Sequence, residues 1–213
     1  MNVAFRLEGV RIALGARELV PPLDLAIAPG ECVTVMGPSG SGKSTLLAYL
    51  CGALDPAFAA SGRVFVGADD VTRLAPERRR IGILFQDDLL FPHLSVGGNL
   101  AFALPASVRD SGERRARIGQ ALAEADLAGF AERDPFTLSG GQRSRVALMR
   151  TLLAGPRALL LDEPFNKLDA KLRSEFRRFV FDHAAERRLP MLLVTHDAAD
   201  AEAAGGRVIE LAG

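Results

Sequence analysis

The strongest constraint on this chain is a glycine-rich run, GPSGSGKS, from Gly37 to Ser44. The run matches the pattern G-x-x-x-x-G-K-[ST], in which the glycines let backbone N–H groups surround the oxygens of a phosphate. A short β-branched strand is expected just before it, at 31–36. A helix is expected just after it, because four leucines between 46 and 54 fall on one helical face. Strand, loop and helix in this order predict a site for the triphosphate of a nucleotide, and eight matched positions argue against a glycine-rich turn without a ligand.

Two side chains of the run have the chemistry that a triphosphate needs. Lys43 is one of three lysines among 26 basic residues, and its ammonium group can reach the β- and γ-phosphates as a point charge. The hydroxyl of Ser44 can ligate Mg²⁺. The residues expected to hold the nucleotide here are Gly37, Pro38, Ser39, Gly40, Ser41, Gly42, Lys43, Ser44 and Thr45.

A pair of acids, Asp162 and Glu163, follows the apolar run at 158–161. An acid at the C-terminal end of a parallel strand lies where ligands bind in sheets of this kind. We expect Asp162 to hold Mg²⁺, directly or through water, and Glu163 to accept a proton from the attacking water. An ordinary helix-capping pair would look the same in isolation, so it is the glycine-rich run that favours the functional interpretation.

A second helix start with anion-binding character lies at 138–142, LSGGQ. Ser139 is a good N-cap, and Gly140 and Gly141 allow close approach of the backbone. A chain with two such helix starts either binds two ligands or shares one ligand with another copy of itself.

The pattern of apolar residues predicts an α/β fold. After residue 155 short apolar strands alternate with helical stretches, which implies a mostly parallel sheet with helices on both faces. The first 30 residues, with turns expected at Gly9, Gly15 and the prolines at 21–22, are typical of an antiparallel meander. Residues 113–154 are helical in pattern, interrupted near Gly129 and at 134–135, and are expected to form a separate lobe.

Composition excludes several classes of protein. Basic and acidic residues number 26 each, so the formal net charge is zero, which argues against a nucleic-acid partner. No apolar run approaches the ~20 residues needed to cross a bilayer, and the N-terminus lacks the layout of a signal peptide. Cys32 and Cys51 have no metal-ligand spacing, and we expect two small buried side chains in a reducing, cytoplasmic compartment.

Taken together, the motifs resemble those of the nucleotide-binding subunits of ABC transporters. The matching stretches are GPSGSGKST at 37–45, FQ at 85–86, LSGGQ at 138–142, LLLDEP at 159–164, LD at 168–169 and TH at 195–196. Their order covers nearly the whole chain, and LSGGQ is specific to this class among P-loop ATPases. The resemblance implies a single ATPase domain over 1–213. Its P-loop NTPase core would comprise 1–86 and 156–213, with an N-terminal antiparallel β-subdomain, and an α-helical subdomain would be inserted at about 87–155.

The resemblance also implies roles for individual residues. Gln86 would sense Mg²⁺ and the γ-phosphate, Asp169 would lie at a dimer interface, and His196 would contact the γ-phosphate. Residues 139–142 would close over the ATP held by a second copy, in a head-to-tail homodimer with two ATP molecules. The implied catalytic residues are Lys43, Gln86, Glu163 and His196, the implied Mg²⁺ ligands are Ser44, Gln86 and Asp162, and the implied contacts to the nucleotide outside the P-loop are Ser139, Gly140, Gly141, Gln142 and Asp169.

Two positions depart from the family pattern. Leu14 stands where family members usually place an aromatic residue that stacks on adenine. Leucine can pack on the base without π-stacking, so the selectivity for adenine is expected to be weaker and use of GTP stays open. Asn166 stands where serine is more common, which leaves the contacts of that loop open.

Further segments resemble bacterial importers, namely 85–104 and 168–173, and the run DEPFNKLD at 162–169 is similar to the short thiamine-type and YnjD-type subunits. We therefore expect a peripheral ATPase at the cytoplasmic face of the inner membrane. It would drive import through integral membrane permease subunits, supplied by a periplasmic solute-binding protein. The chain stops at Gly213, soon after the last expected strand, so no C-terminal regulatory domain is expected.

Three other classes of function stay open at this point. An exporter subunit would carry the same motifs. An ABC ATPase that acts on DNA or RNA usually needs a coiled-coil insertion, tandem ATPase halves or basic extensions, and the sequence has none of these. A P-loop kinase for a small molecule has no use for LSGGQ.

Overall fold

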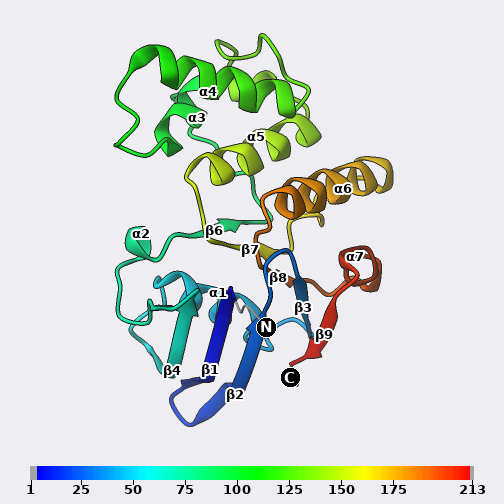
Figure 1. The fold of residues 1–213 in the computed structure, drawn as a ribbon. Helices are drawn as coiled ribbons and strands as arrows, with labels where there is room; N and C mark the ends of the chain where they lie inside the picture. Colours follow the sequence, from blue (N-terminus) through cyan, green and yellow to red (C-terminus); the bar gives the residue numbers. More distant parts are fainter. Residues whose placement is uncertain (1–3, 212–213) are drawn as a thin grey trace. The chain divides into compact units, whose positions relative to one another are not determined.

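The computed structural model describes residues 4–211, and these divide into two compact units. The first unit comprises the described residues up to 83, residues 157–163 and those from 181 onward. The second comprises 84–156 and 164–180. Figure 1 shows the elements of both units along the chain.

An antiparallel sheet forms the N-terminal part of the first unit. Its strand order is β2-β1-β4-β5, with β2 at Arg17–Ile27, β1 at Phe5–Leu14, β4 at Phe58–Val66 and β5 at Asp69–Asp70. The turn expected at Gly9 is wrong, because β1 continues through this residue. Gly9 instead has a φ of 54° where the register of β1 against β2 and β4 shifts, which is the signature of a bulge.

The prolines at 21 and 22 also lie inside a strand and not in a turn. They are exposed residues of β2, which is an edge strand of the antiparallel sheet. Proline has no backbone N–H, so within sheets it is confined to edges, strand ends and bulges. Here the register shift between Val10 and Ile12 of β1 accommodates the pair.

The second sheet of the first unit has the strand order β6-β7-β8-β3-β9. The strands are β6 at Ile81–Leu84, β7 at Ala158–Asp162, β8 at Met191–Val194, β3 at Cys32–Met36 and β9 at Arg207–Glu210. Strand β3 pairs in parallel with both β8 and β9, and β7 pairs in parallel with β8. The α/β class with a parallel and an antiparallel sheet is thus confirmed. The strands expected at 31–36 and 158–161 lie where predicted.

The helices of the first unit are α1 at Lys43–Cys51, α2 at Pro76–Arg79 and α7 at Ala198–Ala204. One core joins α1 to both sheets, because Leu46 and Leu50 cluster with Ile12 of β1 and Leu160 of β7. The helix ends one turn earlier than the leucine pattern suggests. Gly52 adopts a φ of 81° and caps α1, so the chain beyond it leaves the helix.

The two cysteines differ in burial. Cys32 of β3 is buried, whereas Cys51 at the end of α1 is half-buried. Burial raises the pKa of Cys32 to about 12 and that of Cys51 to about 11. Both thiols therefore stay protonated near neutral pH, where a thiol is a poor nucleophile.

The second unit is helical. It contains α3 at Val96–Ala103, α4 at Ser111–Glu124, the 3₁₀ helix η1 at Pro135–Thr137, α5 at Gly140–Leu153 and the N-terminal part of α6, which runs over Ala170–Glu186. Helices α3, α4 and α5 pack on one another. Side-chain caps from Ser95, Asp110 and Ser139 start the three helices. None of the helices in residues 4–211 is long and apolar enough to cross a membrane.

Candidate nucleotide site

The glycine-rich loop connects β3 to α1 and is tightly packed. Gly42, which precedes the first residue of α1, has a φ of 89°, and a Cβ there would lie 3.1 Å from the carbonyl oxygen of Leu19. A Cβ at Gly37 would lie 2.7 Å from the carbonyl oxygen of Leu211. Only glycine fits at both positions, so the pattern of the motif has a steric cause in this fold.

Lys43 folds back over the loop that precedes it. Its side chain is buried, and Nζ donates hydrogen bonds of 2.8 Å to the carbonyl oxygens of Gly37 and Pro38. An ammonium group has three donors, so these two bonds leave one for a ligand. The loop also buries the hydroxyl of Ser41, which has no hydrogen-bond partner among residues 4–211. A buried hydroxyl is costly without a partner, and a phosphate oxygen would supply one.

Two oxygen donors that suit Mg²⁺ lie next to the loop. The exposed hydroxyl of Ser44, in the first turn of α1, lies 3.3 Å from Oδ1 of Asp162 at the end of β7. Burial raises the pKa of the Asp162 carboxyl, and the hydrogen bond from Ser44 opposes this shift. Repulsion from Glu163 raises the pKa further, while Lys43 lowers it. Hydroxyl and carboxylate oxygens are ligands that Mg²⁺ prefers, so this pair fits the ion.

Glu163 has a strained backbone at the same end of the sheet. Its φ is 48°, a value that non-glycine residues adopt only where their surroundings hold them. A backbone hydrogen bond of 2.9 Å to the carbonyl oxygen of Val194 ties it to the end of β8. One of its carboxylate oxygens, Oε2, lies 3.3 Å from Nδ1 of His196. Glu163 thus lies beside the histidine that follows β8, on a backbone that its surroundings hold in a strained conformation.

His196 is 60% exposed, and its loop is anchored by buried neighbours. Thr195 and Asp200 are both fully buried, and the hydroxyl of Thr195 donates to Oδ2 of Asp200 at 2.9 Å. The same hydroxyl accepts a hydrogen bond of 3.0 Å from the backbone N–H of Asp197. Sequence reasoning missed Asp200, since an acid in the first turn of a short helix is common and nothing in its spacing indicates a buried partner. A cavity of about 380 Å³ lies here, lined by Met36, Gly37, Pro38, His196, Glu210 and Leu211.

The start of α5 forms a complete capping box in the second unit. Ser139 Oγ accepts a hydrogen bond of 3.3 Å from the backbone N–H of Gln142. The Gln142 side chain accepts one of 2.9 Å from the backbone N–H of Ser139. Gly140 and Gly141 lie between them, in the first turn of a 14-residue helix. The N-cap predicted at Ser139 is present, and the helix presents its positive end there.

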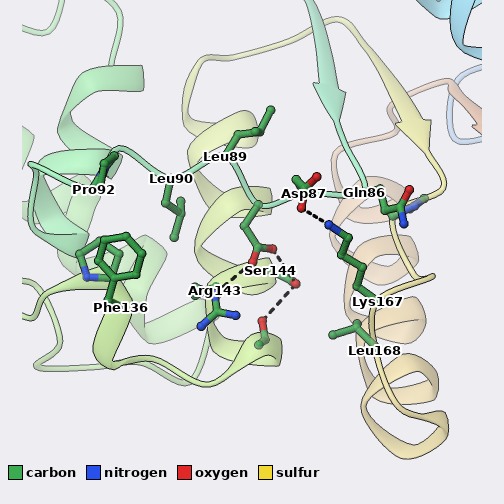
Figure 2. Close-up of a pocket in the computed structure, with 14 residues that line it drawn as sticks. Gln86, Asp87, Leu89, Leu90, Pro92, Phe136, Arg143, Ser144, Lys167 and Leu168 are labelled. Atoms are coloured by element: carbon green, nitrogen blue, oxygen red, sulfur yellow. Dashed lines mark hydrogen bonds and ion pairs between the residues drawn. The ribbon is translucent and has the colours of Figure 1, made fainter.

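The remaining expected residues are spread over both units. Gln86 is exposed two residues after the end of β6 and lines a cavity of about 430 Å³ together with Leu89, Phe136 and Gly140 (Figure 2). Asp169 starts α6, because its Oδ1 accepts hydrogen bonds from the backbone N–H groups of Lys171 and Leu172. Leu14 is 45% exposed at the end of β1 and offers an apolar contact without an aromatic ring.

The structure thus groups the expected residues by unit. The first unit brings together the glycine-rich loop, Asp162, Glu163 and His196. The second holds Gln86, residues 139–142 and Asp169. The first group has the chemistry to bind a triphosphate and to accept a proton from water, whereas the second group offers a helix start for an anion.

Comparisons with known proteins agree with this description. A family model described as ABC transporter matches residues 20–166. The chain is 45% identical over 197 residues to an uncharacterised ABC transporter ATP-binding protein, YnjD, of Escherichia coli (strain K12), and the match covers 92% of this chain and 90% of YnjD. It is 40% identical over 203 residues to the Fe(3+) ions import ATP-binding protein FbpC of Pasteurella multocida. This match covers 95% of this chain but only 57% of FbpC.

Solved structures show the same similarity. MJ0796 has been solved as a dimeric bacterial ABC transporter cassette and as a dimeric post-hydrolysis state bound to ADP and Pi. Both structures match this chain with a TM-score of 0.80 at 32% identity. The first match covers 98% of this chain and the second covers 97%, and each covers 94% of the MJ0796 chain.

Proposed function

This chain belongs to the ABC transporter family, as one of its ATP-hydrolysing subunits, and on that basis we propose that it drives the import of a solute through a separate membrane permease. The identity of 40% to FbpC, which is named as an import ATP-binding protein, supports import. The importer-like segment 85–104 supports the same direction. A periplasmic solute-binding protein would deliver the solute, and this chain would lie peripherally at the cytoplasmic face of the inner membrane.

The contact between Glu163 and His196 beside the Asp162–Ser44 pair is the observation that carries the catalytic part of the proposal. The backbone N–H groups of the glycine-rich loop and Lys43 bind the phosphates. Glu163 accepts the proton of the attacking water, and His196 contacts the γ-phosphate and holds Glu163 in place. Positioning and charge neutralisation do most of the work in phosphoryl transfer, and these residues supply both.

Ser44 and Asp162 would hold Mg²⁺, with Gln86 as a further ligand. Their oxygen chemistry and their separation of 3.3 Å support this assignment. When bound, the ion supplies positive charge that neutralises the phosphate oxygens.

A head-to-tail homodimer would complete two ATP sites. The capping box at Ser139 and Gln142 orders a helix start suited to an anion, and we assign it to the ATP held on the glycine-rich loop of a second copy. Asp169, at the start of α6, would lie at the same interface. The dimeric structures of MJ0796 support the arrangement.

The cavity beside Gln86 is the surface we assign to the permease. Exposed apolar side chains at its rim are typical of a protein interface, because such groups are otherwise costly to leave in water. Leu89 is 57% exposed and Phe136 is 73% exposed, and both line the cavity (Figure 2).

Replacing the proposed base tests the catalytic assignment. Glu163→Gln is expected to keep ATP binding but to lose hydrolysis by about 100-fold or more, since a general base contributes about 10²–10⁴-fold. The measurements are phosphate release and binding of a fluorescent ATP analogue. Glu202→Gln, an exposed acid of α7, is the matched control and should hydrolyse ATP normally. Near-normal ATP hydrolysis by Glu163→Gln would show that Glu163 is not the general base. Lys43→Ala, in contrast, should lower the affinity for ATP.

The direction of transport has its own test. Genes for a permease and a solute-binding protein beside the gene for this chain would identify the partners. Reconstituted in proteoliposomes, the complex should accumulate solute from the side that carries the binding protein, and only with ATP on the side of this chain. Transport in the opposite sense would make it an exporter subunit.

A further inference from the structure

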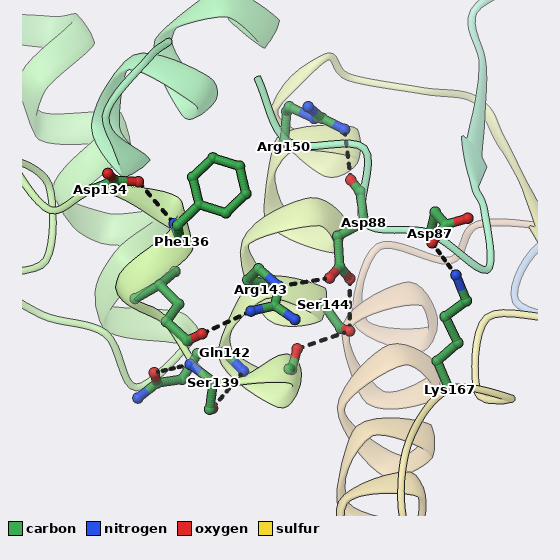
Figure 3. Close-up of polar contacts among 12 residues, drawn as sticks. Asp87, Asp88, Asp134, Phe136, Ser139, Gln142, Arg143, Ser144, Arg150 and Lys167 are labelled. Carbon is green, nitrogen blue, oxygen red and sulfur yellow. Dashed lines mark hydrogen bonds and ion pairs between the residues drawn. The ribbon is translucent and has the colours of Figure 1, made fainter. Parts of the chain in front are cut away.

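Two adjacent carboxylates follow Gln86, and they have different surroundings. Asp87 pairs with Lys167, and both side chains are more than half exposed. Asp88 is only 23% exposed, and each of its oxygens has a partner on α5. Oδ1 accepts a hydrogen bond of 2.8 Å from the hydroxyl of Ser144, and Oδ2 lies 3.3 Å from Nε of Arg143 (Figure 3). The loop after Gln86 is therefore bound to α5 through Asp88.

The two partners of Asp88 also contact the backbone of the LSGGQ segment. Arg143 donates a hydrogen bond of 2.8 Å to the carbonyl oxygen of Leu138. The hydroxyl of Ser144 lies 3.1 Å from the carbonyl oxygen of Gly140. Arg143 therefore links Asp88 to the carbonyl group of Leu138, and the Ser144 hydroxyl bound to Asp88 lies beside the carbonyl group of Gly140.

The hydroxyl of Ser144 cannot serve both acceptors at once. A serine has one O–H hydrogen, and a carboxylate is a stronger acceptor than a carbonyl group. The Asp88 oxygen is also the nearer of the two. While Asp88 is in place, Ser144 donates to it. If Asp88 moves away, the hydroxyl is released to bond Gly140 within the helix, an alternative that bends helices.

The backbone of the Asp88 loop is held by the same helix. Arg150, about two turns beyond Arg143 on α5, donates to the carbonyl oxygens of Asp88 at 3.1 Å and Leu89 at 2.8 Å. Leu89 has a φ of 46°, which is strained for a leucine and persists only where neighbours enforce it. The loop is therefore clamped to α5 at its side chain and at its backbone.

We propose that Asp88 is a positioning residue that sets the start of α5, residues 138–142, according to the place of the loop after Gln86. The proposal rests on the proposed function, in which residues 139–142 contact the ATP of a second copy and Leu89 contacts the permease. A partner that shifts Leu89 would shift Asp88 with it. Arg143 would carry the shift to the carbonyl group of Leu138, and the Ser144 hydroxyl, once released by Asp88, would bond the carbonyl group of Gly140. Asp88 itself does not touch the nucleotide.

ATP-dependent dimerisation of the hydrolysis-deficient Glu163→Gln chain measures this effect. Adding Asp88→Asn is expected to weaken the dimer about tenfold or more, which is the effect of one lost hydrogen bond to a charged group. The affinity of the dilute monomer for ATP should be unchanged, because the glycine-rich loop is intact. Asp87→Asn is the matched control and should leave the dimer unchanged, since its pair with Lys167 is exposed. Dimer formation is followed by analytical ultracentrifugation, and thermal melting checks that each variant is folded.

Ser144→Ala keeps Asp88 and Arg143 but removes one arm. Alone it should weaken the dimer by a smaller factor than Asp88→Asn does. In the double variant the two effects should be less than multiplicative, because both substitutions break the same contact. If Asp88→Asn fails to fold, Ser144→Ala decides the outcome by itself. An unchanged dimer for every folded variant, or fully multiplicative effects, would overturn the proposal.

The proposed function and the role of Asp88 fail in different ways. If the Glu163→Gln chain forms no dimer with ATP, the head-to-tail assignment is wrong whatever Asp88 does. If it dimerises and the Asp88 and Ser144 variants dimerise equally well, only the positioning role is wrong.

Discussion

Asp162 is the residue at which function and stability conflict most directly. Its assigned task requires a charged carboxylate, yet burial and the neighbouring Glu163 disfavour that charge and raise its pKa. A carboxyl whose pKa is raised on folding binds its proton more tightly in the native state than in the unfolded chain. Its favourable contribution to the free energy of unfolding is complete below the pKa of the unfolded chain, about 4. This contribution is lost as the pH rises through the pKa of the native state.

The variant Asp162→Asn is therefore expected to be more stable than the parent chain at pH 7. Asparagine has no charge to desolvate and can still accept the hydrogen bond from Ser44. The free energy of unfolding, measured in urea without nucleotide, should favour the variant at pH 7, and the difference should shrink as the pH falls toward 4. The same variant should lose ATP hydrolysis, a trade-off common at active sites.

Asp182→Asn is the control for this experiment, because Asp182 is an exposed acid of α6. It should change stability by less than about 0.5 kcal/mol at either pH. A lower stability of Asp162→Asn at pH 7 would show that the hydrogen bond from Ser44 outweighs the cost of burying the charge.

The sequence predicted those residues whose contacts lie close by in the chain, and it missed those whose partners are distant in sequence. Lys43, Ser44 and Ser139 belong to contiguous motifs whose neighbours in sequence are also their neighbours in space, so their placement followed from local pattern. Asp88 gave no signal, because its partners are 55 and 56 positions away and the pairing exists only once the helices have packed.

At the scale of elements, α1 is fixed at both ends. Gly42 sets its first turn, and the buried guanidinium of Arg79 closes its last turn. Arg79 donates hydrogen bonds of 2.8 and 2.9 Å to the carbonyl oxygens of Tyr49 and Leu50. It also bonds the carbonyl oxygens of Thr72 and Leu74, so a single side chain joins α1 to the segment that leads into α2. A cation near the C-terminus of a helix is stabilising in its own right.

The substitution Arg79→Ala is expected to lower the free energy of unfolding by about 3 kcal/mol. It would remove the hydrogen bonds to four carbonyl oxygens, of which that of Tyr49 keeps a bond from the backbone N–H of Gly52. A buried carbonyl left without a partner costs about 1–3 kcal/mol. Urea denaturation gives the value. The neighbouring Arg78 is exposed, so Arg78→Ala should change stability little. Equal effects of the two substitutions would mean that the helix end does not depend on Arg79.

The positions of strands could be predicted from the sequence where a short apolar run marks the strand. The strand expected at 31–36 is β3 with one residue fewer, and the apolar run at 158–161 is β7 with one residue more. Helix α3 was missed because Gly97 and Gly98, which are poor helix formers, lie in its first turn. Packing against α5 and the cap from Ser95 outweigh that cost. The turn expected at Gly9 was wrong for a related reason, since pairing on both sides of β1 carries the strand through the glycine.

At the scale of the whole molecule, an ATP site shared between two chains predicts that two inactive variants can complement each other in a mixed dimer. Lys43→Ala disables one half of the site and Ser139→Arg the other, and each variant alone should hydrolyse ATP at a few per cent of the parent rate or less. Mixed in equal amounts, they should recover about a quarter of the parent rate. Half of the dimers are then mixed, and one of the two sites in each mixed dimer has both halves intact.

Phosphate release from the mixture, measured at several ratios of the two variants, tests this expectation. Recovery should be greatest at equal amounts and absent in either variant alone. A mixture that merely averages the two variants at every ratio would mean that each chain completes its own site.

The edge strand β2 adds a constraint on how copies of this chain can meet. Any strand that tried to extend the antiparallel sheet would encounter Pro21 and Pro22, two successive positions with no N–H to offer. The ladder would break there, and the bulge opposite already twists the edge away from flatness. The prolines therefore disfavour edge-to-edge pairing of sheets from different copies, which is a common route to aggregation. The proposed head-to-tail dimer uses other surfaces, at the glycine-rich loop and residues 139–142, and does not need this edge.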